Sequence, residues 1–564
     1  MSDILKIFGQ EFTGVKGIIA TNNNNVNLIY KKDAPAPVTV RFFDYDGSLL
    51  HSYTTEEFLS LTAMPENPSH VGLISQGWNW SLADARALVT TYGSCNIGQM
   101  YITDDGKTRI YLEMPEGRRS PYLALCPNGT VTVDWGDGSS TDTLTGTSLT
   151  TLKYVQHTYP SAGSYVMTLT ATSGEFAFYG DSNTPSFLRY TTGSSSDIGY
   201  KAKGYINTIQ KIKLGEGVRI GQRAFNNCYS LASITIPDSV ASIGTYAFSG
   251  CYSLASITIP DSVTSISIYA FQYCHSLASI TIPDSVTSIG NYAFQNCYSL
   301  ASITIPDGVT SIEQRAFNSC YSLASITIPD GVTSIGTYAF SGCNSLTSIT
   351  IADSVTSIGN YAFSDCRSIA SITIPDGVTS IGTYAFSGCN SLASITIPDS
   401  VTSIGNYAFS DCRSIASITI PDGVTSIGND AFEYCYSLSS VTIPDGVTSI
   451  GGSAFSSCNS LASITIPDGV TSIGSSAFQY CRSLTSITIP DDVTSIGSSA
   501  FSSCYGLAEI HFKPTTPPTV ANSNAWTDLN TDCIIYVPSG TLSAYKSATN
   551  YPSSSTYTYM EESA

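Results

Sequence analysis

Cysteine is the reactive residue type that recurs most regularly in this sequence. Thirteen of its sixteen cysteines follow one another at intervals of 23 residues, from Cys228 to Cys504. If the chain stacks at this interval, successive thiols could hold a metal ion or form disulfides. Metal sites gather Cys and His within a few residues of each other, as in C-x-x-C, and this sequence has no such pair. We therefore expect a buried row of free thiols that act as small hydrophobic side chains in a reducing cytosol, with no metal and no cofactor.

A row of aspartates shares the same interval and could carry a second chemistry. One Asp ends each Ile-Pro-Asp segment, as Asp238, Asp261 and Asp284 do, and the row runs to Asp491. Carboxylates brought close by stacking would repel one another unless an ion relieved the charge, so calcium could bind between the coils. The alternative, which we favour, is an Asx-type turn at each corner, because Asp after Pro readily bonds the backbone of a turn.

Catalytic residue types are few and scattered. The five histidines are His51, His70, His157, His275 and His511, which fall in different parts of the chain. None lies beside a Ser or Cys nucleophile motif, and the sequence contains no G-x-S-x-G, phosphate-binding loop or H-E-x-x-H. A glycosidase that pairs two distant carboxylates stays open, but a regular repeat offers no obvious cleft for it. We expect no catalytic residue and a protein that is not an enzyme.

The position after each periodic cysteine varies although its neighbours do not, and this variation points to binding. We call these residues the post-cysteine row: Tyr229, Tyr252, His275, Tyr298, Tyr321, Asn344, Arg367, Asn390, Arg413, Tyr436, Asn459, Arg482 and Tyr505. Tyr and Arg are enriched at binding hot spots and stack on sugars or aromatic groups, so we expect a ligand-binding ridge. The alternative is that turn positions merely tolerate change. A second set, the tyrosine row, comprises Tyr246, Tyr269, Tyr292, Tyr338, Tyr361, Tyr384 and Tyr407 and gives way to Ser453, Ser476 and Ser499.

The elements that position these rows follow from the apolar residues between them. Each unit reads L-x-x-I-x-I-P-D-x-V-x-x-I-G-x-x-A-F-x-x-C, and its alternating Leu-Ala-Ser-Ile-Thr-Ile predicts a strand with one buried face that Pro-Asp ends. One unit could gain about 12 to 15 kcal/mol from apolar burial, less than backbone ordering costs at about 1 to 2 kcal/mol per residue. Stacking closes this deficit. We predict a solenoid of about 13 coils, about 60 Å long, with Ser and Thr ladders on an open sheet face.

This unit resembles the leucine-rich repeats of the BspA-like type, and the resemblance runs over residues 209–512. It implies a mainly β fold dominated by a leucine-rich-repeat solenoid. It also implies a general binding scaffold, since such repeats occur in bacterial surface proteins, some protists and phage-encoded proteins. Two blocks recur unchanged 46 residues later, one ending at Leu346 and again at Leu392, the other beginning at Gly359 and again at Gly405. This recurrence indicates recent duplication of a repeat pair.

The flanking segments divide the rest of the chain. Residues 116–175 resemble a β-sandwich of the polycystic-kidney-disease (PKD) type on Trp135, Gly136, Asp137, Gly138, Ser139, His157, Tyr159, Gly163 and Tyr165. Residues 37–115 resemble a small α+β, β-grasp-like module of bacterial adhesins. Residues 1–36 are similar to the N-termini of virion proteins from gut phages, which implies an attachment segment. We expect residues 176–208 to be a linker and N-terminal cap of the solenoid, and residues 513–564 to be its C-terminal cap.

The charge and hydropathy of the chain argue against two classes of partner, nucleic acid and the membrane interior. A net charge of −19 repels phosphate backbones, so nucleic acid is not expected. No run of 18 apolar residues occurs, so membrane insertion is not expected, and the N-terminus lacks the apolar core of a secretory signal.

These features predict a non-enzymatic adhesion protein of a phage virion, a tail or head fibre that is assembled in the host cytoplasm. It would recognise a bacterial surface protein or glycan through its solenoid and contact other virion proteins through its N-terminal segment. A homo-oligomer such as a trimer would gain avidity. One alternative is an extracellular BspA-like surface adhesin of a bacterium or protist that binds host proteins or glycans. Another is a virion-associated enzyme that cleaves polysaccharide.

Overall fold

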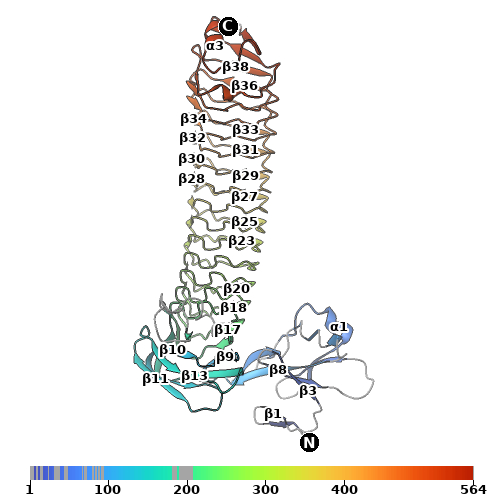
Figure 1. Cartoon of the computed structure of the whole chain (residues 1–564), viewed down its shortest axis with the longest axis vertical. Helices are drawn as coiled ribbons and strands as arrows, with labels where there is room; N and C mark the ends of the chain where they lie inside the picture. Colours follow the sequence, from blue (N-terminus) through green and yellow to red (C-terminus); the bar gives the residue numbers. More distant parts are fainter. Residues whose placement is uncertain are drawn as a thin grey trace.

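The computed structural model describes residues 49–66, 105–117, 119–180, 187–189 and 208–562, together with shorter stretches of the first 103 residues. Its largest part is a long rod of stacked coils, with the C-terminus at the far end of the rod (Figure 1). A unit of longer strands lies at the other end, and a smaller unit that contains helix α1 lies beside it (Figure 1). The predicted mainly β solenoid is confirmed.

Each coil of the solenoid buries the apolar positions of one 23-residue unit. In the unit that ends at Cys274, the side chains of Ile257, Val263, Ile266 and Phe271 are at most 5% exposed. The phenylalanine rings of successive coils stack with centroids 5.2 to 5.6 Å apart, from Phe248 to Phe501. Because every coil repeats the same inward positions, the interior is one continuous hydrophobic core.

Two rows of short parallel strands line the coils. The first row is β17 (Ser233–Thr235), β18 (Ser256–Thr258), β20 (Ser279–Thr281), β23 (Ser325–Thr327), β25 (Ser348–Thr350), β27 (Ser371–Thr373), β29 (Ser394–Thr396), β31 (Ser417–Thr419), β33 (Ser440–Thr442) and β36 (Ser486–Ile489). The second row is β19 (Ser265–Ile266), β21 (Ser288–Ile289), β22 (Ser311–Ile312), β24 (Ser334–Ile335), β26 (Ser357–Ile358), β28 (Ser380–Ile381), β30 (Ser403–Ile404), β32 (Ser426–Ile427), β34 (Ser449–Ile450), β35 (Ser472–Ile473) and β37 (Ser495–Ile496). Paired strands are in register at an offset of one repeat, as Ile257 with Ile280 shows.

The corner after each first-row strand is closed by the backbone. The Val263 amide donates to the Pro260 carbonyl at 3.0 Å, and the Val286 amide donates to the Pro283 carbonyl at the same distance. The aspartate that follows each proline is exposed. The predicted turn is present. The expected closure by the aspartate side chain is replaced by a backbone hydrogen bond, because the carbonyl of the proline itself accepts from the amide three residues later.

The strands of the predicted sandwich do not form a separate unit, because their sheet continues into the solenoid. Its strands are β9 (Thr108–Met114), β10 (Tyr122–Asp134), β11 (Asp142–Thr147), β12 (Lys153–Gln156), β13 (Gly163–Phe178), β14 (Leu188–Arg189), β15 (Ile209–Lys213) and β16 (Val218–Ile220). The order β11-β10-β13-β9-β15-β17 leads into the first strand row. β16 pairs with β13, and bridges from Ile220 to Ile243 and from Ile243 to Ile266 lead into the second row.

Two expected boundaries shift as a result. β9 lies within residues 37–115, yet it pairs with β13 and β15 and so belongs to the sandwich sheet. β13 extends beyond residue 175, and the ring of its Phe178 lies 5.0 Å from that of Phe225 in the solenoid core. The sandwich therefore caps the first coil directly. Most of residues 176–208 lie outside the described residues.

The N-terminal part contains short antiparallel strands and one small module. β1 (Leu5–Ile7) pairs with β2 (Gln10–Phe12), and β3 (Gly17–Asn22) pairs with β4 (Asn25–Tyr30). The module joins β5 (Thr39–Phe43), β6 (Leu49–Thr54), β7 (Leu73–Trp78) and β8 (Cys95–Thr103) in the order β6-β5-β8-β7, with α1 (Thr55–Ser60). Its small core contains Phe42, Phe58 and Ile97. The side chains of residues 1–36 lie outside the described residues, so the attachment role stays a prediction.

The C-terminal segment extends both strand rows and covers the last coil. It contains β38 (Glu509–Phe512), β39 (Thr519–Val520), the 3-10 helix η4 (Ser523–Trp526), β40 (Ile534–Val537), α3 (Leu542–Ser547) and β41 (Thr558–Glu561). The Trp526 ring continues the phenylalanine stack at 5.3 Å from Phe501. Among the described residues, no helix is long and apolar enough to cross a membrane.

Candidate binding surface

The post-cysteine row forms a line along the rod, because each member occupies the same place in its coil. The rings from Tyr229 to Tyr321 make an unbroken stack with centroids 4.4 to 4.8 Å apart, and His275 is one of its five rings. The exposed members of the row are Tyr252, Tyr321, Arg367, Arg413, Tyr436, Arg482 and Tyr505. The half-buried members are Tyr229, His275, Tyr298, Asn344, Asn390 and Asn459. That this row binds a ligand stays a prediction.

The arginines of the row are held by local contacts. Arg367 pairs with Asp365 at 3.2 Å, and Arg413 pairs with Asp411 at 3.1 Å. The Arg482 guanidinium lies 6.0 Å from the centre of the Tyr505 ring. Exposed ion pairs of this kind contribute about 0 to 1 kcal/mol, so a ligand could open them at small free-energy cost.

The tyrosine row forms a second stack. Rings from Tyr246 to Tyr292 lie 4.4 to 4.5 Å apart, and rings from Tyr338 to Tyr407 lie 4.3 to 4.5 Å apart. Arg315 joins the two segments, with its guanidinium 5.5 Å from the Tyr292 ring and 4.5 Å from the Tyr338 ring. The row thus continues from Tyr246 to Tyr407, with Arg315 in the place of one ring.

Every member of the tyrosine row has a left-handed backbone, with φ between 56° and 60°. This conformation costs an L-residue about 1 to 2 kcal/mol, and Gly or Asn is its usual occupant. Stacking of aromatic rings returns about 0.5 to 1.5 kcal/mol per pair. The rings therefore add little net stability. Arg315, Asp430 and Ser453 have the same left-handed backbone at this position in other coils, so the strain belongs to the turn.

Exposed aromatic side chains gather on the same side of each coil. In the described solenoid, residues 209–512, the exposed large hydrophobic side chains are Tyr252, Ile268, Tyr273, Tyr321, Tyr434, Tyr436, Tyr480 and Tyr505. All of them lie in the turn between a second-row strand and the next first-row strand. We call this turn surface, with the post-cysteine row and the tyrosine row, the aromatic edge.

Stacking decides how this edge can bind. Each ring inside a stack has both faces against its neighbours, as the Tyr252 and His275 rings do at 4.6 Å with 2° between their planes. A face that is already covered cannot stack on a sugar. The expectation that the tyrosines stack on sugars is therefore corrected for the rings within the stacks, which offer a ligand only their edges and hydroxyl groups.

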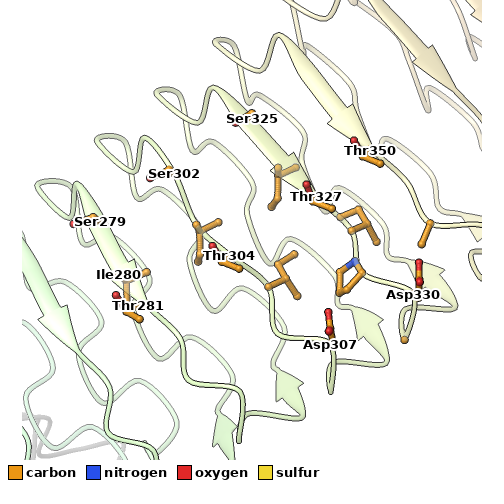
Figure 2. A pocket seen from close by; sticks show the side chains of 17 residues that line it. Ser279, Ile280, Thr281, Ser302, Thr304, Asp307, Ser325, Thr327, Asp330 and Thr350 are labelled. Atoms are coloured by element: carbon orange, nitrogen blue, oxygen red, sulfur yellow. The ribbon is translucent and has the colours of Figure 1, made fainter.

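The first strand row forms a different surface. A shallow groove of about 1040 Å³ crosses it between residues 279 and 352. Figure 2 shows Ser302, Thr304, Ser325 and Thr327 along successive coils that cross it. These are the predicted hydroxyl ladders, and Asp307 is at the rim. The surface carries no exposed aromatic side chain among the described residues.

The periodic thiols are buried and free, as predicted. Each thiol from Cys251 to Cys504 also donates to the phenylalanine carbonyl of the preceding coil, as Cys389 does to Phe363 at 3.3 Å. Burial raises the pKa of the Cys389 thiol to about 12. These thiols are therefore poor nucleophiles and serve as a hydrogen-bonded part of the core.

Other titratable groups do not assemble into a reactive site in the described part of the chain. His157 pairs with Asp137 at 2.7 Å in the sandwich, and His511 pairs with Glu562 at 2.5 Å in the C-terminal cap. His275 lies in the ring stack, and burial lowers its pKa. No group of three or more metal-ligating side chains occurs among the described residues.

The residues that carry the PKD resemblance meet in one cluster. The Trp135 ring stacks on His157 at 4.7 Å, and Tyr159 lies 4.3 Å from Tyr165. Burial alone would raise the pKa of Asp137, but hydrogen bonds from Ser139 and His157 outweigh it and lower that pKa. The cluster holds the sandwich together, and membership of the PKD type stays a prediction.

Two features of the coil escaped sequence reasoning. One is the left-handed backbone of the tyrosine row, which no residue type signalled because Tyr is unusual there. The other is an amide ladder in which Gln272 donates to Gln295 at 2.7 Å and Gln295 donates to Asn318 at 3.0 Å. The recurrence of Gln and Asn two residues before each of these cysteines was the available signal.

The matching family model agrees with this architecture. No curated protein matches the sequence significantly. A leucine-rich repeat protein from Bacteroides ovatus is 28% identical, over 63% of this chain and 95% of that chain, with a TM-score of 0.48. A leucine rich cell surface protein from Faecalibacterium prausnitzii is 37% identical, over 52% of this chain and 83% of that chain, with a TM-score of 0.36. The family model for the BspA type leucine rich repeat region matches residues 196–324, 310–439 and 425–537, more than half of the sequence. The chain belongs to the BspA-type leucine-rich-repeat family.

Proposed function

We propose that the protein is a non-enzymatic binding protein that attaches to a bacterial surface through the aromatic edge of its solenoid. The observation that carries this proposal is the gathering of all exposed large hydrophobic side chains of residues 209–512 on that edge. Clustered Tyr and Arg side chains of this kind are typical of binding hot spots.

The experiment compares attachment of the full chain and two variants to bacterial cells. The edge variant changes Tyr252, Tyr321, Tyr436 and Tyr505 to Ser. The control variant changes Thr258, Thr327, Thr442 and Thr488, four exposed residues of the first strand row, to Ser. We expect the edge variant to lose attachment while the melting temperature stays close to that of the unmodified chain, and the control to attach normally. Normal attachment of the edge variant would refute the proposal.

The place of action is a second part of the proposal. We infer a tail or head fibre, with the solenoid directed at the host, from the expected similarity of residues 1–36 to virion proteins of gut phages. Immunogold electron microscopy tests this, since label on virions is expected and label only on cells would make the protein a cell-surface adhesin instead. Incubation with host polysaccharide should leave the polymer intact, and released oligosaccharide would show an enzyme.

A further inference from the structure

The duplicated repeat pair presents one surface twice. Residues 331–376 and 377–422 are identical except at two positions, where Thr347 corresponds to Ala393 and Ala352 corresponds to Pro398. Thr347 is exposed and Ala352 is buried, and neither is on the aromatic edge. The edge of the first copy therefore has the same side chains as the edge of the second.

The two copies also fold alike. The Ser368 hydroxyl donates to the Asn344 carbonyl at 2.6 Å, and the Ser414 hydroxyl donates to the Asn390 carbonyl at 2.7 Å. The rings of the tyrosine row are 4.3 Å apart within each copy. Two equivalent patches thus lie next to each other along the rod.

Within each copy the two coils differ, and the difference sets a spacing. The first coil presents Asn344, and the second presents the exposed ion pair of Asp365 and Arg367. The pattern repeats with Asn390 and with Arg413, which is paired with Asp411. On this edge, coils that carry an ion pair therefore alternate with coils that carry none, at a repeat of two coils, or about 9.6 Å if coils are about 4.8 Å apart. A ligand that engages both patches and distinguishes the two kinds of coil must repeat at that length.

The side chains of the patch select the chemistry of the ligand. Aspartate accepts hydrogen bonds and arginine donates them, and asparagine offers its amide NH2 as a donor, since the Oδ1 of Asn390 is buried. Hydroxyl groups match this set because they also donate and accept. An anionic polymer would meet the patch aspartates and a chain whose net charge is −19. A polyproline-type peptide binds through aromatic-lined grooves, whereas the ring faces in this stack are covered.

On the basis of the proposed binding function, we propose that residues 331–422 bind an extended, neutral, linear glycan that lies along the rod. Two sugar rings joined end to end have a length close to that of two coils, so one disaccharide unit meets each copy of the patch. Arg367 and Asp365, with their counterparts Arg413 and Asp411, bond the sugar hydroxyls, and the tyrosine hydroxyls offer further partners along the line.

Coil insertions in the full chain test the spacing. One variant carries a second copy of residues 308–330 between Asp376 and Gly377, which changes the distance between patches from two coils to three. The other carries a second copy of residues 285–330 there, which changes it to four. Binding to immobilised β-glucan, xylan and mannan is measured, with the melting temperature as the folding control. We expect the one-coil insertion to lower the affinity at least about tenfold, because simultaneous engagement is lost, and the two-coil insertion to restore it.

Patch variants complete the test. The change of Asn344 to Ala with Arg367 to Gln, and the change of Asn390 to Ala with Arg413 to Gln, should weaken binding equally. Equal binding by both insertion variants would overturn the proposal, as would binding to none of the three polymers or binding to a Gly-X-Y peptide instead. Loss of cell attachment in the four-tyrosine variant together with unchanged insertion variants would leave the binding function standing and remove only the glycan spacing.

Discussion

The left-handed tyrosines allow a sharp test of what holds the aromatic edge in place. Tyr361 has φ of 57°, and its ring stacks on Tyr338 at 4.3 Å and on Tyr384 at 4.5 Å. Replacement by Ala removes both stacking contacts, worth about 1 to 3 kcal/mol together. It keeps the left-handed strain of about 1 to 2 kcal/mol, because Ala has a β-carbon.

Replacement by Gly removes the same contacts but also relieves the strain. Part of this gain in stability is lost, because glycine loses more conformational freedom on folding than alanine does, which costs about 0.5 to 1 kcal/mol. The difference predicts that Tyr361→Gly is more stable than Tyr361→Ala by about 0.5 to 1 kcal/mol, the reverse of the usual order.

The assay is urea unfolding of the full chain, followed by circular dichroism. Long repeat arrays can unfold in more than one step, so hydrogen exchange of amides in the neighbouring coils provides a local measure. The matched control is Ser371, an exposed strand residue of β27, where Ala should be more stable than Gly. An Ala variant at residue 361 that equals or exceeds the Gly variant in stability would show that the strain argument is wrong.

Three further predictions concern the core and the titrating groups. The periodic thiols, such as Cys389 with its pKa raised to about 12 by burial, should resist a thiol reagent at pH 8 in the native protein and react fully in denaturant; rapid native labelling would contradict their burial. The change of Phe386 to Ala should destabilise the chain by about 3 to 5 kcal/mol in urea unfolding, because the fully buried ring stacks on Phe363 and Phe409; a loss below about 1 kcal/mol would contradict a rigid core. Burial and the neighbouring Asp430 raise the pKa of Glu433 from 4.5 to about 7, so the folded state binds more protons than the unfolded state between these values. Stability should therefore fall as the pH rises from about 4.5 to 7, and Glu433→Gln should weaken this dependence.

The solenoid was predictable because every repeat must bury the same set of apolar side chains. Apolar residues recur in each unit at the positions of Ile257, Val263 and Phe271, so only stacking in register buries them all, and the observed pairing of Ile257 with Ile280 follows. The junction with the sandwich was not predictable in this way. β9 and β15 pair although about a hundred residues separate them, and no periodic signal marks such a long-range contact.

For the candidate binding surface, too, the sequence predicted some properties and contacts between coils decided the others. The residue types of the post-cysteine row and the tyrosine row were evident from their interval alone. Their conformations depended on contacts between coils, since the stack of Tyr252 on His275 closes the ring faces and the carbonyl of Phe363 gives Cys389 its hydrogen bond.

Sequence alone determined the coil, its length of 23 residues and the row along which the variable side chains lie. The reason is that regularly spaced apolar residues are all buried only when equal coils stack in register. Tertiary structure decided which chemical groups those side chains still offer to a ligand, because stacking of one coil on the next covers ring faces and leaves edges, hydroxyls and ion pairs exposed.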